Sequence, residues 1–277
     1  MDHHEKLAWS SQHLHALDLE IHDFIRQHPL SARCEQEGDS RRFRVIANDY
    51  PLLPPHWPLM VGDAIHNLRG ALDHLIWALT DKAVAKGGPR PNSTEALKIG
   101  YPACLKHGAY FGVGDNLGNG ARKRQVGWIG DDALAVVDST QPYLSGEDAH
   151  NHPLAVLASF SNEDKHRNLI ASAALASSIQ FTIRNTPNAT GRFVLTSVSF
   201  VRPGDWWFHS GADLGTAELG DGSTHRPGDV ELIPDFTGTV AFRQKGPSTP
   251  ITVESLVMLG ESLLEQVIVP LDAILMR

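Results

Sequence analysis

The feature of this sequence that most constrains its fold is a change of periodicity along the chain. Apolar residues recur at three- and four-residue spacing over 5–27 and again over about 59–84, which predicts amphipathic helices. Alternating, β-branched patterns run through 178–247, and 250–276 returns to a helical pattern that is apolar over much of its surface. We therefore expect an α+β fold, a mainly α-helical bundle with an antiparallel β insertion before its last helix.

Shorter signals divide the chain further. We expect residues 1–177 to form the helical bundle, with a long Gly-rich loop at 87–127, and residues 178–247 to form the β region. Within the bundle, further helices are predicted over 130–140 and 150–175, the latter with Pro153 in its first turn. Residues 248–277 are expected to pack back on the bundle as one helix that Pro270 kinks. A short strand is also predicted at the segment RRFRVIAND, residues 41–49.

Composition bears on the compartment and the partners. The chain has 277 residues and a net charge of −8, and its two cysteines, Cys34 and Cys104, form no CxxC pair, which is typical of a reducing compartment. The N-terminus has no signal-peptide pattern, and no stretch reaches the roughly 18 apolar residues of a membrane span. We expect a cytoplasmic protein without a membrane partner. The acidic balance disfavours broad nucleic-acid binding but permits a local basic site.

The segment GDAIHNLRGALDHLIWAL, Gly62–Leu79, has two contrasting faces on a helical wheel. One face is apolar, whereas the other lacks the Glu, Lys and Gln of an ordinary wet surface. A glycine in its middle costs about 1 kcal/mol of helix stability relative to alanine and lets a helix, a partner subunit or a ligand approach the backbone. This face is a candidate functional site, with a buried hydrogen-bonded network or a plain solvated face as the alternatives. Its members are Asp63, His66, Asn67, Gly70, Asp73, His74 and Trp77, with Arg69 at the margin.

A second polar cluster lies in the segment SNEDKHRN, Ser161–Asn168. We expect Lys165, His166 and Arg167 to join the first cluster in space and to bind phosphate. The alternative is that residues 162–164 cap a helix and that the basic residues are solvated. In the β region, the adjacent Trp206 and Trp207 suggest stacking on a base or sugar, or else half-buried packing.

Metal binding is one chemistry that these residues permit. Carboxylate and imidazole sets bind Zn, Mn or Fe, and Asp63 and His66 share a face at three-residue spacing. Helix-bundle carboxylate enzymes use a Glu-x-x-His spacing, but here the pattern is Asp-x-x-His and occurs once. The alternative function is therefore a metal-dependent helix-bundle enzyme with a divalent metal held by Asp63, His66, Asp73 and His74.

Cleavage of a phosphodiester without a cofactor is the other chemistry. Arg69 supplies a fixed charge for a phosphate, and His74 can exchange a proton near neutral pH. Asp73 is expected to orient a histidine, while His66 and Asn67 line the site. Five residues of separation turn Arg69 and His74 about 140° apart, so a second copy across a two-fold axis would complete the site. We therefore expect a homodimer.

The Arg-x4-His spacing of LRGALDHLIWAL resembles the signature helix of the HEPN superfamily. Those proteins are commonly dimeric helical bundles, and many are metal-independent endoribonucleases in toxin–antitoxin, abortive-infection and CRISPR systems. The resemblance implies phosphate contact by Arg69, proton transfer by His74 and RNA as a partner. The residue after the arginine is usually polar in HEPN nucleases, whereas here it is Gly70, and HEPN domains without nuclease activity are known.

The chain also resembles a family of uncharacterised actinobacterial and phage proteins over residues 5–170. The shared features are the segment GDAIHNLRGALDHL, a QPY near residue 142 and NEDKHR near residue 165. This resemblance implies that the two polar clusters belong to one architecture. The leading interpretation is a HEPN-like RNA-binding protein or endoribonuclease in phage defence or a toxin–antitoxin system. A non-catalytic dimeric scaffold, with both clusters as structural networks, is a further alternative.

Overall fold

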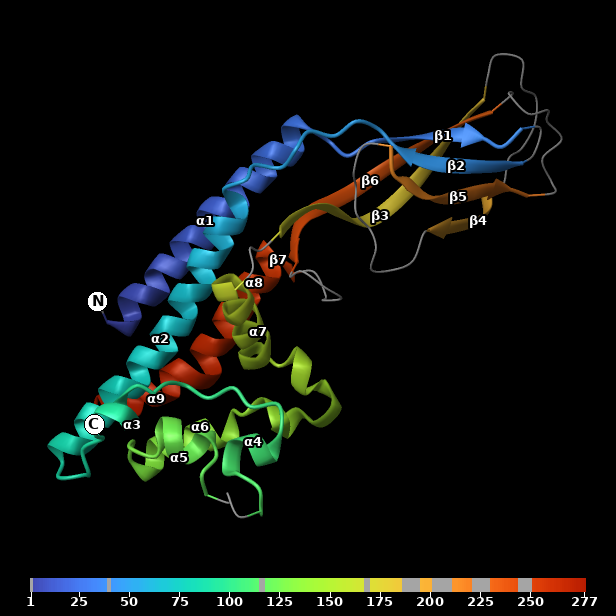
Figure 1. Ribbon diagram of the computed structural model, residues 1–277. Helices are drawn as coiled ribbons and strands as arrows, with labels where there is room; N and C mark the ends of the chain where they lie inside the picture. The colour runs from blue at the N-terminus through green and yellow to red at the C-terminus, as the bar shows by residue number, and fades with distance from the viewer. Residues whose placement is uncertain are drawn as a thin grey trace. The chain divides into compact units, whose positions relative to one another are not determined.

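The computed structural model describes residues 2–38, 41–114, 118–166, 170–185, 195–200, 211–220, 230–243 and 251–277 (Figure 1). Its elements are helices and antiparallel strands, which confirms the expected α+β class. Contacts between Cα atoms divide the chain into two compact units. The helical unit comprises Met1–Leu17, Pro58–Leu169 and Val253–Arg277, and the sheet unit comprises Asp18–Trp57 and Ile170–Thr252.

Long helices at both ends of the chain and one after the first hairpin supply most of the helical unit, and the periodicity predicted all of these. The last of them is divided by a π-helical turn. The helices are α1 (His3–Gln27, of which the first part belongs to this unit), α2 (Trp57–Ala85), α3 (Ser93–Ala96), α4 (His107–Phe111), α5 (Ala121–Val126), α6 (Asp131–Ser139), the 3-10 helix η2 (Pro142–Asn151), α7 (Pro153–His166), α8 (Val253–Leu263), the π-helix η3 (Leu264–Ile268) and α9 (Val269–Leu275).

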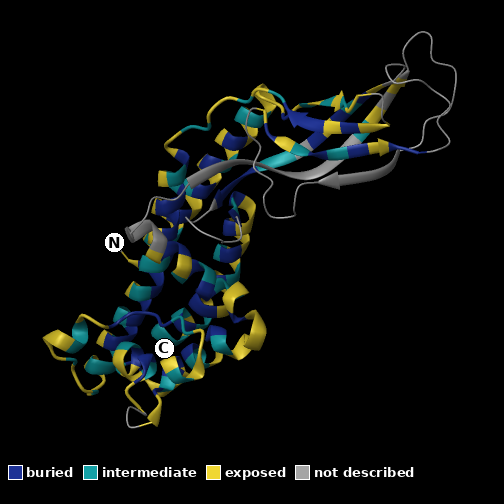
Figure 2. Cartoon of the chain, turned by 45° about the vertical axis from the view of Figure 1, so that its right-hand side comes forward, coloured by how far each residue is buried: buried dark blue, intermediate teal, exposed yellow. Residues whose placement is uncertain are grey.

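The core of the helical unit lies where α1, α2 and the C-terminal helices face one another, and Figure 2 shows their buried residues in dark blue. Hydrogen bonds join the elements as well: Ser10 Oγ donates to the Ala64 carbonyl at 2.9 Å, and Lys82 Nζ donates to the carbonyls of Ile274 and Leu275 at 2.9 and 2.7 Å. The buried residues of this core include Leu14, Leu17, Val61, Ile65, Leu68, Leu72, Leu75, Ile76, Leu79, Leu157, Leu256, Leu263 and Leu271.

None of the helices in the described ranges is long and apolar enough to cross a bilayer.

The C-terminal helix adapts to Pro270 through η3. Proline has no N–H to donate and its ring crowds the carbonyl four residues earlier, so a regular helix cannot continue unchanged past it. The chain widens into the π-helical turn Leu264–Ile268 and resumes as α9, with Pro270 near its start. The predicted irregularity therefore lies in the turn just before the proline.

The segment predicted as a long Gly-rich loop contains three short helices, α3, α4 and α5. The prediction of a loop over 87–127 was wrong at these places because the three helices are too short to show a periodic pattern. Only α3 begins with a side-chain cap. The Asn92 side chain accepts hydrogen bonds from the amides of Thr94 and Glu95, and the Glu95 carboxylate accepts from the Asn92 amide. This capping box starts α3 at Ser93, a few residues after α2 ends at Ala85.

The sheet unit holds two antiparallel sheets. One has the order β1-β2-β5-β4 and the other the order β3-β6-β7. Their cores share a buried cluster made of Leu30, Phe43, Val45, Ala47, Ala212, Ala217, Leu219, Leu232 and Phe236. The strands are β1 (Ala32–Gln36), β2 (Arg42–Ala47), β3 (Ile170–Asn185), β4 (Leu195–Phe200), β5 (Asp213–Leu219), β6 (Val230–Arg243) and β7 (Ile251–Thr252).

Three boundaries differ from those expected. The C-terminal helix predicted over 250–276 begins at Val253, because Ile251 and Thr252 form β7 and belong to the sheet unit. The helix predicted over 150–175 ends at His166, and β3 begins at Ile170, opposite Arg243 of β6. The Ala-rich segment after residue 170 suits a helix by local propensity, but pairing with a long neighbouring strand determines its structure. The strand predicted at 41–49 is β2, which pairs with β5, so it belongs to the sheet unit and not to a bundle of residues 1–177.

Candidate functional site

The candidate site on α2 is a polar stripe along an otherwise buried helix. The apolar positions predicted to face the core are buried, among them Ala64, Leu68 and Leu75. On the opposite side, the side chains of three predicted site residues are exposed and four other members of the stripe are half-buried. The exposed members are Asp63, His66 and His74, and the half-buried members are Asn67, Gly70, Asp73 and Trp77.

Gly70 is covered by the side chain of Lys6, which comes from α1. The Cδ and Nζ atoms of Lys6 lie 3.1 Å from the position that a Cβ of residue 70 would occupy. Residues 66, 70 and 74 follow one another at helical-turn spacing along the stripe, so the residue that the ammonium covers lies about one turn from His66 and one turn from His74. The close approach predicted from the glycine is therefore made by a lysine of the same chain, a site residue that the sequence did not reveal.

The Lys6 ammonium and the two exposed imidazoles are available for a ligand. In the part of the chain that the structure describes, the side chains of Lys6, His66 and His74 make no hydrogen bond or ion pair. Asn67 Nδ2, by contrast, donates to the Asp63 carbonyl at 2.9 Å within the helix. The stripe thus carries one cation and two groups that can exchange protons, all accessible to solvent.

Arg69 and Asp73 form a clamp on the backbone of Tyr101. The Arg69 Nη2 donates to the Tyr101 carbonyl at 2.6 Å and lies 3.2 Å from Asp73 Oδ1, which in turn accepts the Tyr101 amide at 2.8 Å. The Arg69 side chain is 21% exposed, so part of its guanidinium still faces solvent. Asp73 therefore pairs with an arginine and an amide, and not with a histidine as the sequence suggested.

The Tyr101 side chain continues this clamp into the core. Its ring is fully buried, and its hydroxyl shares a hydrogen bond with Thr140 Oγ1. Burial raises the pKa of Tyr101, an effect that outweighs the opposing hydrogen bond and the nearby Arg69 charge. Tyr101 is a neutral anchor that fixes the chain before α4 against α2 and α6.

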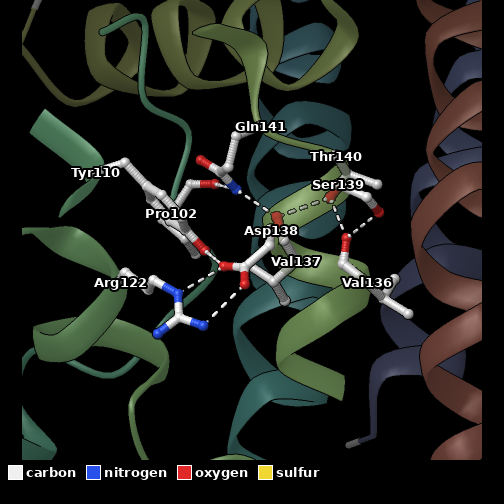
Figure 3. Close-up of polar contacts among 9 residues, drawn as sticks. All are labelled: Pro102, Tyr110, Arg122, Val136, Val137, Asp138, Ser139, Thr140 and Gln141. Atoms are coloured by element: carbon white, nitrogen blue, oxygen red, sulfur yellow. Dashed lines mark hydrogen bonds and ion pairs between the residues drawn. The ribbon is translucent and has the colours of Figure 1, made fainter. Parts of the chain in front are cut away.

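A second polar network is centred on Asp138 of α6 (Figure 3). The Arg122 Nε and Nη2 atoms donate to its two carboxylate oxygens at 2.8 Å each, and the Tyr110 hydroxyl donates to Oδ1 at 2.7 Å. Burial raises the pKa of Tyr110, and its hydrogen bond to the Asp138 carboxylate adds to this effect. This network braces α4 and α5 against α6, and Arg122 is paired within it.

Gln141 supports the same region from the core. Its Nε2 donates to the carbonyls of Pro102 and Val137 at 3.1 Å each, and its Oε1 accepts the Cys104 amide at 3.3 Å. All donors of its side-chain amide are thereby used. We interpret the residues of Figure 3 as a structural network, because each polar group that they bury has a protein partner.

The phosphate-binding side chains predicted in the second cluster lie outside the part of the chain that the structure describes, so their distance from the first cluster is not part of the site geometry. Lys165 and His166 lie in the last turn of α7, but the placement of their side chains is outside the description, and Arg167 lies outside the described residues altogether. The same holds for Trp206 and Trp207. Their phosphate-binding and stacking roles stay predictions.

A different set of residues assembles into a possible metal centre. No three of Asp63, His66, Asp73 and His74 bring ligand atoms within 4.8 Å of one another, although all four are described. Instead, His3 and His4 of α1 meet Asp272 of α9 within that distance. The sequence signal is the adjacent pair His3-His4, but nothing local to it indicates Asp272.

A pocket of about 280 Å³ lies between the end of α2, the start of α6 and the end of α9. Its charged lining has both signs, with Lys82 and Arg277 facing Asp131 and Asp132. Since Lys82 already caps two carbonyls of α9, the pocket offers no concentrated charge to a ligand.

The two cysteines are free thiols, as the sequence suggested. Burial raises the pKa of Cys34 to about 11 and also raises the pKa of Cys104. Neither thiol is therefore activated as a nucleophile.

Comparison of this chain with protein-family models, with curated proteins and with solved structures finds no match.

Proposed function

We propose that the chain is a HEPN-like RNA-binding protein and metal-independent endoribonuclease whose site is the open stripe of α2. The observation that carries the proposal is the ammonium of Lys6 lying on Gly70. Gly70 is the residue one helical turn from both His66 and His74, whose side chains are exposed. A cation between proton-exchanging groups suits a phosphodiester, because the charge holds the phosphate while an imidazole moves a proton. Phage defence or a toxin–antitoxin system is the setting that we propose with it.

The reaction that suits these groups is internal transesterification of RNA. A 2′-hydroxyl oxygen attacks the adjacent phosphorus, the new 2′-O–P bond forms and the P–O5′ bond breaks. One imidazole takes the proton of the 2′-hydroxyl, and an imidazolium gives a proton to the departing 5′-oxygen. The products are a 2′,3′-cyclic phosphate and a 5′-hydroxyl. Lys6 and the partly exposed Arg69 side chain would neutralise the charge that develops on the non-bridging oxygens of the phosphate.

The spacing of the two imidazoles disfavours both proton transfers within one chain, which supports the proposal of a homodimer. His66 and His74 are eight residues apart on α2, a rise of about 12 Å along the helix axis. One phosphate held by Lys6 would therefore meet one of them at a time. A second copy related by a two-fold axis could present its own imidazole from the opposite side.

The test uses the full-length chain, purified without a tag, on a fluorescently labelled single-stranded RNA in EDTA. His74→Ala and Lys6→Ala are compared with the wild-type protein, with His15→Ala and Lys123→Ala as matched controls at exposed positions on α1 and α5. Cleavage is followed on gels, product ends are identified by mass spectrometry, and RNA binding is measured by fluorescence anisotropy.

We expect cleavage to cyclic-phosphate ends, with a loss of about 10²-fold or more in His74→Ala and weaker RNA binding in Lys6→Ala. Equal cleavage by His74→Ala would show that His74 does not move the proton, and equal cleavage by the double variant His66→Ala/His74→Ala would show that α2 is not the catalytic helix. Binding that depends on Lys6 without any cleavage would remove the nuclease part of the proposal and keep RNA binding. An absence of both would overturn the proposal.

The clamp on Tyr101 favours a second candidate, a dimeric scaffold without catalytic activity. Arg69 and Asp73 form hydrogen bonds to the Tyr101 backbone, and such bonds between side chains and backbone are typical of residues that stabilise the fold. In that case Arg69→Ala would lower stability without changing RNA binding, and sedimentation would still report a dimer.

A further inference from the structure

The first turn of α1 brings two consecutive histidines onto one carboxylate of α9. His3 Nε2 lies 2.7 Å from Asp272 Oδ1, and His4 Nε2 lies 3.3 Å from Asp272 Oδ2. The two imidazole rings are stacked at a tilt of 37°, with centroids 4.1 Å apart. Consecutive residues of a helix point about 100° apart, so this convergence requires both side chains to turn toward the same point.

The environment of these residues is unlike that of an exposed charge cluster. The His3 side chain is 8% exposed and the Asp272 side chain 17%, whereas that of His4 is 54% exposed. The buried His3 approaches one oxygen of the Asp272 carboxylate, and the exposed His4 presents its Nε2 to the other oxygen. Two imidazole nitrogens therefore converge on one partly buried carboxylate.

We propose that His3, His4 and Asp272 bind a divalent transition-metal ion, with Zn²⁺ as the best match. Two imidazole nitrogens and one carboxylate oxygen are a common zinc donor set, and all three ligand atoms lie within 4.8 Å of one another. Ligands about 2.0–2.1 Å from a tetrahedral ion are about 3.4 Å apart, so binding would displace the proton between His3 and Asp272 and spread these two atoms slightly. The exposed side of His4 leaves room for water as a fourth ligand.

The consequence of such a site is a metal bridge between the start of α1 and α9. Helix ends fray easily because their terminal backbone groups lack partners within the helix, and the metal would fasten the turn that leads to Lys6. The proposal does not rest on RNA cleavage. The same ion would nevertheless order the turn from which Lys6 reaches Gly70.

The experiment is a titration of the full-length, tag-free protein with ZnCl₂, followed by calorimetry and by thermal unfolding. His4→Ala and Asp272→Asn are compared with the wild type, and His15→Ala is the matched control because His15 is an exposed histidine of the same helix. His4 is exposed, so its removal leaves folding intact, and circular dichroism checks this for each variant. The chain has 15 histidines, which makes the matched control essential.

We expect the wild type and His15→Ala to bind one Zn²⁺ and to unfold at a higher temperature with zinc present. Binding should weaken at least about tenfold in His4→Ala and Asp272→Asn, and their stabilisation by zinc should disappear. Equal binding by all four proteins would place zinc on other histidines and overturn the proposal. An absence of binding to the wild type at 100-fold excess of zinc over protein would overturn it as well.

Discussion

The side chain of Lys6 lies on the backbone of α2 at Gly70, with its Cδ and Nζ atoms 3.1 Å from where a Cβ would be. This contact gives a physical reason for a glycine in the interior of a long helix. A side chain at residue 70 would share that space with the lysine. The loss of helix propensity at Gly70 is thus linked to the position of a cation on the proposed RNA-binding stripe.

Replacing Gly70 by alanine should therefore stabilise the protein slightly. Alanine favours the helix by about 1 kcal/mol over glycine, and the added methyl meets only the flexible end of Lys6, which can shift by a few tenths of an ångström. We expect the free energy of unfolding, measured by urea denaturation, to rise by about 0.5–1 kcal/mol. Compared with Lys6→Ala, the double variant Lys6→Ala/Gly70→Ala should show the full gain in the free energy of unfolding. A double variant less stable than Lys6→Ala would contradict the explanation.

Asp73 should matter for stability through the Tyr101 amide. Tyr101 is fully buried, and Asp73→Ala leaves its N–H without the acceptor that it has at 2.8 Å. We expect a loss of about 1–3 kcal/mol in the free energy of unfolding, with a smaller loss in Asp73→Asn, which keeps an oxygen acceptor. Asp63→Ala is the control, because the Asp63 side chain is exposed on the same helix, and it should change stability by less than about 0.5 kcal/mol.

The long helices were predictable because the spacing of their apolar residues indicates which face is buried. Leu68, Leu72, Leu75 and Leu79 recur at the helical period, and all are buried in α2. The polar stripe followed from the same wheel, since the side away from the core holds the short polar groups. Proline and β-branched residues likewise indicated the C-terminal irregularity and the strands.

The remaining features depend on contacts that no local pattern encodes. His3 and Asp272 are 269 positions apart, and the pairing of β2 with β5 joins segments from opposite halves of the chain. Lys6 looks like an ordinary solvated residue of α1 until Gly70 is placed beneath it. Likewise, Arg122 and Asp138 read as surface charges of two separate short helices, and only the fold brings them together.

The Asp138 network predicts a specific dependence of stability on pH. Burial acts to raise the pKa of Asp138, but hydrogen bonds from Arg122 and Tyr110 outweigh it and leave this pKa lowered. A carboxyl with a lowered pKa in the folded state stabilises the fold above its unfolded pKa, about 3.9, and that contribution is lost as the pH falls through the folded value.

The difference in stability between wild type and Asp138→Asn should therefore be largest near pH 7 and shrink below about pH 4. Urea midpoints at pH 7, 5 and 3 would measure it. Asp132→Asn is the matched control, an exposed carboxylate in the same helix, and its difference from wild type should stay small at every pH. A difference in stability between wild type and Asp138→Asn that stays constant with pH would mean that the charge of the carboxylate does not contribute to stability.

Gly120 and Gly130 offer a test of close packing at two equivalent positions. Each precedes a helix as its N-cap, each has an extended backbone, with φ of −68° and −65°, and neither makes a side-chain cap. A Cβ at residue 120 would overlap the carbonyl group of Tyr110, whereas one at residue 130 would meet nothing within 4 Å. Any propensity cost of alanine at an N-cap is common to both positions, so the difference in stability between the two variants isolates the steric effect.

We expect Gly120→Ala to be less stable than Gly130→Ala by about 1–3 kcal/mol in urea unfolding, because backbone and not a flexible side chain must move. Equal stability of the two variants would show that α4 is free to shift away from α5. The brace that Tyr110 and Arg122 form by sharing Asp138 would then be looser than its hydrogen bonds indicate.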